Sequence, residues 1–366
     1  MKATALILVL ALLISAIGVL SIYSSTYRKE GMQWESTYQR QLLWVVLGVA
    51  FFFLLSGINY RRIWDATYLL YAAAALLLLL VFILGVVRLG AQRWLRLAWF
   101  TFQPSEITKL IVVIFIARYF SAKSVDDVSL KVSKMGPLRG LVLPMAFVAV
   151  PMVLIMEQPD LGSAMMILFV FIAMLFVSGV RMRYLVIFII LGLLSLPLFW
   201  HMLRDYQRDR LMVFLNPNID PLGAGYTVIQ SKIAIGSGGI FGKGWLSGTQ
   251  SQLHFLPESH TDFIFATFAE EWGFMGSCLL LFLYYLIIRE GIRIAGRTAD
   301  NFGKLLAMGI SLMLGLQVIV NIAMNLGMAP VVGLPLPLMS YGGSSIIVTF
   351  IALGILANID RTRAVF

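Results

Sequence analysis

The sequence predicts an all-α polytopic membrane protein, with about ten transmembrane helices and a long extracytoplasmic loop between the seventh and eighth. Of the 366 residues, 60% are hydrophobic and only 13% are charged, whereas soluble domains are roughly 45 to 50% apolar and 25% charged. The mean hydropathy is +0.90, and the apolar blocks are long enough to cross about 30 Å of hydrocarbon. A soluble globular protein is therefore excluded.

Ten apolar blocks give the candidate spans. The fourth is short and contains Lys109 and Arg118. We expect the spans at residues 3–23, 41–57, 67–87, 106–120, 138–156, 161–179, 182–200, 264–288, 304–327 and 342–358. With an even number of spans both ends lie on one side of the membrane, and residues 1–366 form a single integral membrane domain.

The basic residues predict the orientation. With the N-terminus in the cytoplasm, 16 of the 28 lysines and arginines fall in cytoplasmic segments and six in short outer segments. Positive charge in short loops favours the cytoplasmic side, while long loops carry no weight. Both termini are expected in the cytoplasm, and the net charge of +10 reflects topology and contact with membrane lipids, with no nucleic acid as partner.

The fourth and sixth spans begin with polar residues on the outer face. Glu106 and Lys109 are three residues apart and share a helix face. One interpretation is a capped helix start, with Ser105 as the cap and Glu106 at the positive end of the helix dipole. The other is a functional pair, since a lysine at this depth needs a carboxylate or phosphate partner. Gln158-Pro159-Asp160, before the sixth span, allows the same two interpretations.

Residues 201–263 form an outer loop of about 63 residues. Loops of this length within a compact bundle are usually functional or disordered. Apolar residues at 212–215, 228–229, 233–235 and 245–246 are sufficient for short amphipathic helices that pack against the membrane. We therefore expect an ordered cap.

Cationic side chains gather on the outer face. Guanidinium groups match phosphate oxygens in pairs, so a cluster beside the membrane suits a lipid-linked diphosphate. Anchoring to lipid head groups is the alternative. The residues concerned are Arg93, Arg96, Arg204, Arg208, Arg210, Lys232 and Lys243.

The glycine-rich run from Gly236 to Gly244 does not fit a nucleotide-binding motif. Ser237 stands where a P-loop has its first glycine, Gly244 replaces the Ser or Thr after the lysine, and Phe241 replaces the third glycine of the dinucleotide pattern. We expect these glycines to let the backbone approach a phosphate or a neighbouring helix closely.

The end of the long loop contains the first candidate for a catalytic group, Asp262. It is either a cap or first-turn acid of the eighth span, or a general base that acts on a hydroxyl from the boundary between water and hydrocarbon. Glu270 lies eight residues further on, about 12 Å deeper and within about 80° around the helix, and is expected to line the same cavity.

Metal and redox chemistry leave little trace in the sequence. His201, His254 and His260 are too loosely spaced for a zinc site, but carboxylates and water remain suitable for Mg²⁺ or Mn²⁺. The single cysteine, Cys278, excludes a disulfide framework.

Polar and irregular sequence marks the last two spans. Gln317, Asn321 and Asn325 are four residues apart and form a polar stripe, which is typical of hydrogen bonding between helices. A cavity wall is the alternative. The Pro- and Gly-rich stretch from Pro330 to Gly343 either lines a watery cavity at membrane depth or is a plain outer loop.

Several of these segments together resemble the SEDS (shape, elongation, division and sporulation) family over nearly the whole chain. The matching residues are Ala91 to Leu95, Phe102 to Glu106, Gln158 to Gly162, Pro257 and His260 to Phe265, and the set Asn321, Gly327, Met328, Pro330, Gly333, Leu334 and Leu338 to Ser345. The long loop resembles the RodA-like branch, through Asp205 to Arg210, Asp220 to Tyr226, Gln230 to Gly239 and Gly242 to Gln252.

The resemblance implies a peptidoglycan glycosyltransferase that polymerises lipid II outside the bacterial cytoplasmic membrane during cell elongation. The glycan would pass from undecaprenyl diphosphate to the GlcNAc 4-hydroxyl of lipid II. The resemblance also implies a divalent cation, no organic cofactor, and work beside a class B penicillin-binding protein within the elongation machinery. Asp262 matches the family's essential aspartate, and Arg208, Arg210, Lys232 and Lys109 are candidates to neutralise the diphosphate.

The full set of candidate substrate-binding residues extends beyond these cations. It comprises Arg93, Glu106, Lys109, Asp160, Gln207, Arg208, Arg210, Lys232, His260, Thr261, Glu270, Ser340 and Tyr341.

Two other functions compete with this interpretation. A lipid II flippase or other transporter usually has paired repeats and ionisable residues near the midplane, whereas the polar residues here gather at one face. A non-catalytic scaffold for a penicillin-binding protein would use Asp262 only as a helix cap.

Overall fold

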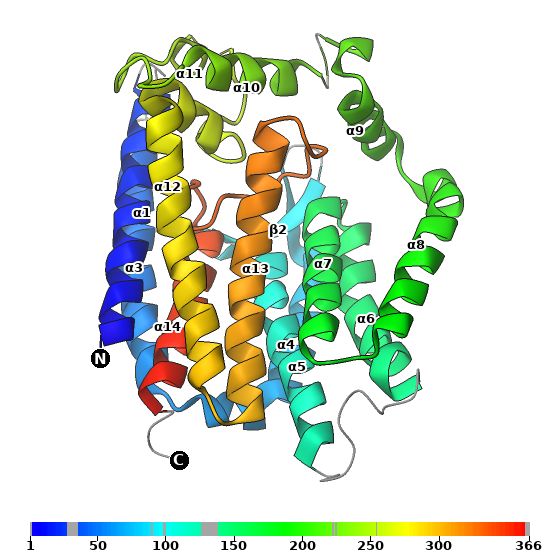
Figure 1. Cartoon of the computed structure of the whole chain (residues 1–366). Coiled ribbons are helices and arrows are strands. Elements are labelled where there is room, and N and C mark those ends of the chain that lie inside the picture. The colour runs from blue at the N-terminus through cyan, green and yellow to red at the C-terminus, as the bar shows by residue number, and fades with distance from the viewer. Residues whose placement is uncertain are drawn as a thin grey trace.

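The computed structural model describes residues 2–27, 36–88, 91–97, 100–125, 138–221, 223, 225–253 and 255–362. His254, one of the histidines considered for a metal site, lies outside these residues. The described chain is mostly helical, and a bundle of long helices is covered at one end by short ones (Figure 1).

Each predicted span overlaps a helix of the bundle. The helices are α1 (Lys2–Thr26), α3 (Thr37–Gly57), α4 (Tyr60–Leu84), α5 (Pro104–Val125), α6 (Leu143–Glu157, after a π-helical turn Leu138–Val142), α7 (Leu161–Val177), α8 (Met182–Met202), α12 (Ile264–Arg297), α13 (Asn301–Asn325) and α14 (Gly343–Thr362). Within the described residues, seven helices are long and apolar enough to cross a membrane, and α7 and part of α8 form two shorter apolar helices. The chain is therefore a multi-pass membrane protein, while the number of ten crossings stays a prediction.

The interior of the bundle is formed largely by α13 and α14. Phe350, Leu353 and Leu356 on α14 are fully buried, as expected for a helix that is apolar on all sides. By contrast, Leu194 on the peripheral α8 is 71% exposed. Such exposed apolar side chains are suited to contact with lipid.

A small antiparallel sheet occupies the connection between α4 and α5. It contains β1 (Gly85–Arg88), β2 (Ala91–Leu97) and β3 (Phe100–Phe102), in the order β1-β2-β3. The all-α prediction is wrong for this segment, because a run this short, rich in branched and aromatic residues, pairs with itself more readily than it forms a helix. The register of the β1–β2 pair shifts between Val86 and Val87, so Arg93 is an extra, bulged residue of β2, and Ala91 and Leu95 on either side of it are buried.

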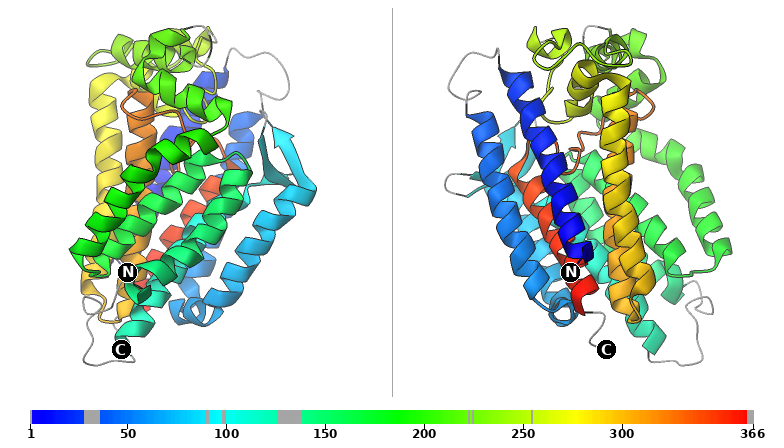
Figure 2. Two further views of the ribbon diagram at one scale, coloured as in Figure 1. Left: turned by 90° about the vertical axis from the view of Figure 1, so that its right-hand side faces the viewer. Right: turned by 60° about the vertical axis from the view of Figure 1, so that its left-hand side comes forward.

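The expected ordered cap is present over one end of the bundle, called the cap end below. It consists of α9 (Asp205–Leu215), a 3₁₀ turn (Pro217–Ile219), α10 (Tyr226–Ser237) and α11 (Thr249–Gln252). Helix α1 begins and α14 ends at the opposite end of the bundle (Figure 1). Figure 2 shows the small sheet in the half of the bundle nearer the cap.

The glycine-rich run completes a break in α12. At Gly273 the backbone leaves the helical region, with φ 64° and ψ −164°. The amides of Phe274 and Met275 donate to the carbonyls of Gly239 and Ile240, at 2.9 and 3.0 Å. The unpaired backbone groups at this end of the broken helix are thus satisfied by the cap.

The same glycine-rich run also donates hydrogen bonds to the carbonyls before the break in α12. The amides of Lys243 and Gly244 donate to the carbonyls of Glu270 and Glu271, each at 3.0 Å. A Cβ on Gly242 would lie 2.1 Å from the Glu271 carbonyl oxygen, so only glycine allows this approach. Of the two roles predicted for these glycines, close approach to a neighbouring helix is confirmed.

A pair of alanine substitutions tests how tightly the cap is docked. A Cβ on Gly238 would lie 2.1 Å from the carbonyl oxygen of Ala269, whereas nothing lies within 4 Å of one on Gly236. Gly238→Ala is expected to destabilise the protein by about 1 to 3 kcal/mol, and Gly236→Ala to be neutral or to stabilise α10 by up to about 1 kcal/mol. Thermal unfolding of the detergent-solubilised variants measures both, and equal melting temperatures would contradict the close docking.

Candidate functional site

Asp262 is held through its backbone. Its carbonyl oxygen accepts hydrogen bonds from the Nδ2 atoms of Asn321 and Asn325 on α13, both at 3.0 Å. Asn321 Nδ2 also donates to the carbonyl of Leu334, at 2.7 Å. The polar stripe predicted on this helix therefore bonds to the irregular segments that surround it.

Asp262 does not cap α12. The N-cap residue is Phe263, which makes no side-chain capping bond, and the amide of Ala266 donates instead to Oδ1 of Asn325, at 3.2 Å. The Asp262 carboxylate makes no hydrogen bond or ion pair with any described residue. Its Oδ2 would lie 3.5 Å from a Cβ on Gly333, so a glycine keeps the space beside it open.

The segment before α14 supports the two residues that precede Asp262. Ser340 Oγ donates to the carbonyl of Thr261 at 2.7 Å and accepts from the amide of Leu336 at 2.7 Å. The Tyr341 amide donates to the carbonyl of His260, at 2.9 Å. The predicted residues His260, Thr261, Ser340 and Tyr341 thus come together with Asp262, and their backbone contacts fix the loop.

Burial is the main reason why the Asp262 carboxyl is a weaker acid than usual. Desolvation raises its pKa from 3.8 to about 6, with a further rise from the negative charge of Glu258. The cations of Arg210 and Arg93 oppose this rise, and Asp160 adds to it. A carboxyl with a pKa near 6 is charged at neutral pH and is a better proton acceptor than an ordinary aspartate.

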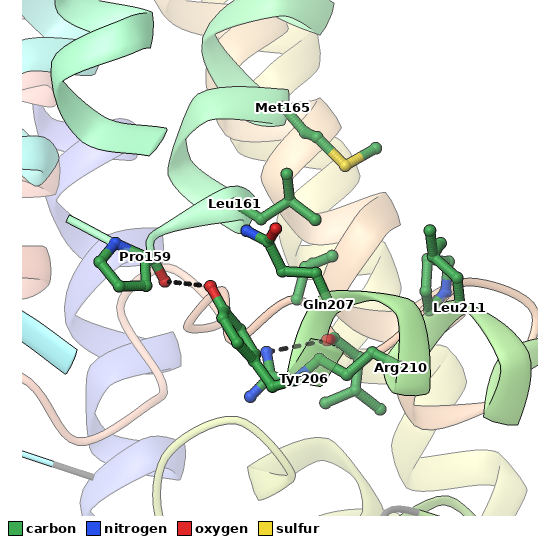
Figure 3. A pocket seen from close by; sticks show the side chains of 10 residues that line it. Pro159, Leu161, Met165, Tyr206, Gln207, Arg210 and Leu211 are labelled. Atoms are coloured by element: carbon green, nitrogen blue, oxygen red, sulfur yellow. Dashed lines mark hydrogen bonds between the residues drawn. The ribbon is translucent and has the colours of Figure 1, made fainter. Parts of the chain in front are cut away.

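Arg210 lies between two shallow pockets at the cap end. One is lined by Pro159 before α7, by Leu161 and Met165 on α7, and by Tyr206, Gln207 and Leu211 on α9 (Figure 3). The other is lined by Val213, Phe214, Val228 and Gly327. Arg210, Pro330 and Val331 line both, so the guanidinium forms part of a shared wall.

Few of Arg210's donors are used within the protein. Among the described residues it makes one hydrogen bond, from Nη1 to the Val331 carbonyl at 3.1 Å. Burial and the neighbouring Arg93 lower the pKa of Arg210, but a guanidinium stays charged in any case. It is the candidate cation best placed to meet an anionic ligand near Asp262.

Two predicted residues form the wall beside this region. Arg93 on β2 donates through Nη2 to the carbonyl of Pro159, and its Nη1 lies 3.7 Å from Oδ1 of Asp160. Asp160 is the N-cap of α7, accepting from the amide of Ser163 at 3.2 Å, and it also accepts from Gln103 and Ser105. The predicted capping role of Asp160 is confirmed.

Other predicted residues have their polar groups occupied elsewhere. Lys109 and Glu106 form a buried ion pair of 2.8 Å within α5, and Gln207 accepts from the Arg204 amide at 3.0 Å as part of a capping box. Arg208 donates to the carbonyls of Trp200 and His201. Each of these side chains thus has polar partners within the protein and needs no ligand to satisfy its polar groups.

Glu270 is bonded to the cap, and Lys232 lies beside Gly327. Glu270 is fully buried and accepts from Lys243 Nζ at 2.7 Å, from the Thr249 hydroxyl and amide at 2.9 Å, and from the Gln250 amide. Its carboxylate joins the cap to α12. Lys232 is exposed on α10, with its Nζ 2.8 Å from the position of a Cβ on Gly327.

The sequence patterns assigned no role to two residues of this region, Glu258 before Asp262 and Tyr206 beside Arg210. Glu258 has a positive φ of 50° and accepts from the Thr261 hydroxyl at 2.9 Å, so it lies close to the turn before Asp262. Tyr206 donates to the Pro159 carbonyl at 3.1 Å. No periodic pattern marks either residue, because Glu258 lies in an irregular turn and Tyr206 acts through a contact with a separate segment.

The described residues contain no group of three or more His, Cys, Asp or Glu side chains that could hold a metal ion. A cage built from protein ligands therefore does not fit this region. Mg²⁺ usually retains water and binds substrate phosphates with only one or two carboxylates.

Comparisons with known proteins relate almost the whole chain to one family. Residues 4–365 match the family model of the FtsW/RodA/SpoVE cell cycle proteins. The chain is 43% identical over 361 residues to a peptidoglycan glycosyltransferase, MrdB, of Escherichia coli K12, covering 98% of this chain and 93% of the relative.

Two solved structures are similar in both sequence and fold. A chain in a peptidoglycan synthase complex, in a study of coordinated polymerization and crosslinking, is 32% identical with a TM-score of 0.81, covering 98% of this chain and 97% of that chain. The rod shape determining protein RodA of Thermus thermophilus is 31% identical with a TM-score of 0.71, covering 98% of this chain and 96% of that chain.

The raised pKa of Asp262 makes a prediction about stability. In the folded protein the Asp262 carboxyl takes up its proton near pH 6, whereas an aspartate in the unfolded chain does so near pH 3.8. Above pH 6 the charged carboxylate therefore lowers the stability of the folded protein, and this loss disappears below about pH 4. At pH 7.5 Asp262→Asn is therefore expected to have a higher melting temperature than wild type, with a gain of at most about 3 kcal/mol in the free energy of unfolding.

The gain in stability of Asp262→Asn over wild type should shrink as the pH is lowered towards 4. Asp209→Asn, on the exposed side of α9, is the matched control and should melt like wild type. A lower melting temperature for Asp262→Asn than for wild type at pH 7.5 would show that the carboxylate is not strained by burial.

Proposed function

This chain belongs to the FtsW/RodA/SpoVE family of cell cycle proteins, and we propose that Asp262 is the general base of its reaction. The chain is a peptidoglycan glycosyltransferase that polymerises glycan strands. The observation that carries the proposed role is a carboxyl group fixed through its backbone, with no hydrogen-bond partner among the described residues and a pKa of about 6.

The reaction needs one well-placed base. Asp262 takes the proton from the GlcNAc 4-hydroxyl of an acceptor lipid II, and the oxygen attacks C1 of the MurNAc that ends the lipid-linked glycan. The bond from C1 to the diphosphate oxygen breaks, and undecaprenyl diphosphate leaves with inversion at C1. A proton acceptor whose pKa lies near the working pH suits this role.

The leaving diphosphate needs positive charge around it. Arg210 lines both pockets, makes one hydrogen bond among the described residues, and its charge acts on the Asp262 carboxyl, so it is the residue proposed to bind the diphosphate. Stabilisation of charge as it develops is usually the largest contribution to catalysis. Arg93 adds its charge from behind Arg210 while bonded to Pro159.

We propose that the divalent cation enters with the diphosphate. Phosphate oxygens and water supply the ligands that Mg²⁺ prefers, and the described side chains do not provide a cage. When bound, the cation would neutralise charge on the leaving group.

The orientation follows from the distribution of charge. We propose ten crossings with α5, α7 and α8 among them, both termini in the cytoplasm, and the cap end outside. Substrate and partner would then meet on the outer face. The proposed partner is a class B penicillin-binding protein of the elongation machinery, in keeping with the peptidoglycan synthase complex that this chain resembles.

Removing the base should remove activity without removing the fold. Asp262→Asn is expected to slow glycan polymerisation by about 10² to 10⁴-fold, while binding of lipid II changes little. The measurement is the rate of glycan ladder formation from labelled lipid II by the chain with its cognate penicillin-binding protein and Mg²⁺ or Mn²⁺. Asp209→Asn is the matched control and should polymerise like wild type. A wild-type rate in Asp262→Asn would show that Asp262 is not the general base.

The rate should also depend on pH through this carboxyl. Because the base works only when charged, and its pKa is about 6, polymerisation at saturating substrate should fall as the pH is lowered through 6. The ladder rate between pH 5 and 8 gives the midpoint. A rate that stays constant down to pH 5 would rule out a base with this pKa.

A further inference from the structure

One backbone carbonyl joins three elements beside Arg210. The carbonyl oxygen of Pro159, just before α7, accepts the Tyr206 hydroxyl of α9 at 3.1 Å and the Nη2 of Arg93 on β2. A carbonyl has two lone pairs and can accept both donors. Pro159 is therefore a fixed point for both Tyr206 and Arg93.

Tyr206 in turn lies against Arg210. The two residues are four apart on α9, one helical turn, and the Arg210 guanidinium carbon lies 5.8 Å from the centre of the Tyr206 ring. Figure 3 shows the hydroxyl of Tyr206 directed at Pro159 while Arg210 extends beside its ring. The second contact that holds the guanidinium is its bond to Val331.

From this arrangement we infer that Tyr206 is a positioning residue for the glycosyl transfer: anchored to Pro159, its ring holds the Arg210 guanidinium where it faces both Asp262 and the diphosphate. This inference rests on the proposed function. Nothing in the sequence pattern assigns Tyr206 a task, and its hydroxyl is engaged with the backbone and so has no direct part in the chemistry.

The charges around Asp262 give this role a measurable signature. The charged groups that influence its carboxyl are Glu258 from the preceding turn, Arg210 from α9, Arg93 from β2 and Asp160 from α7. Arg210 is the larger of the two cationic influences. If the guanidinium loses its support and moves away, Asp262 becomes harder to ionise and the diphosphate loses a partner.

The test compares substitutions of Tyr206 in the full chain with its partner protein. The acid midpoint is the pH at which the rate of glycan ladder formation falls to half its maximum, and Tyr206→Leu is expected to raise it by roughly half a pH unit or more. The same substitution should raise KM for lipid II by about 3- to 10-fold, the effect of losing one cation–π contact. Tyr206→Phe keeps the ring and should have a midpoint closer to wild type. Tyr226→Leu, at the start of α10, is the matched control and should leave the midpoint unchanged.

A double variant tests whether Tyr206 acts through Arg210. Arg210→Gln should move the midpoint in the same direction as Tyr206→Leu and further, and adding Tyr206→Leu to it should change the midpoint no more, because the two residues act as a unit. Independent, additive shifts would overturn the inference. Melting temperatures identify any variant that does not fold, and Tyr206→Met is the second ringless substitution.

The outcomes separate this inference from the proposed function. A normal rate in Asp262→Asn overturns the function itself. If Asp262→Asn is inactive but a folded Tyr206→Leu or Tyr206→Met has the wild-type midpoint, the role of Tyr206 is wrong and the proposed function stands.

Discussion

Asn321 and Asn325 on α13 hold the loop that contains Asp262, and they do so by its backbone. Their amide groups donate to the Asp262 carbonyl, and Asn325 also accepts from the first turn of α12 in place of a local cap. Backbone groups at membrane depth must be satisfied within the protein. Because side chains of another helix supply these bonds, the Asp262 carboxylate is not consumed as a cap and stays free for a proton.

The same constraint explains the cap. Helix α12 is broken at Gly273, which would leave amides and carbonyls unpaired, and the glycine-rich run satisfies them with four backbone bonds while Glu270 binds Lys243 and Thr249. The cap is thus bonded to the helix whose first turn follows Asp262. The polar residues at the cap end are therefore of two kinds. Some, such as Glu270 and Asp160, are bonded within the fold, and others, such as Asp262 and Arg210, are the candidates to meet a substrate.

Local sequence patterns could not make that division. Asp160 and Asp262 stand at the start of apolar helices and each allowed both a structural and a functional interpretation, while Glu270 was expected to line the cavity of Asp262. The difference lies in their partners: Asp160 accepts from Gln103 and Ser105 on another segment, and Glu270 accepts from α11. The Asp262 carboxylate has no hydrogen-bond partner among the described residues and is influenced by the charges of Glu258, Arg210, Arg93 and Asp160. Such contacts join residues far apart in the chain, so no spacing or periodicity encodes them. The candidate substrate-binding residues therefore stay predictions.

By itself the sequence determined that the chain is a multi-pass helical membrane protein, where its apolar helices lie and which family it resembles, and it predicted the short helices of the cap. These properties follow from composition and from runs of apolar residues, which act locally. Only the tertiary structure decided the formation of β1, β2 and β3, the insertion of the glycine-rich run into α12, and the placing of Tyr206 against Arg210 and Pro159. They depend on backbone groups finding partners in distant segments, and only the folded chain brings those segments together.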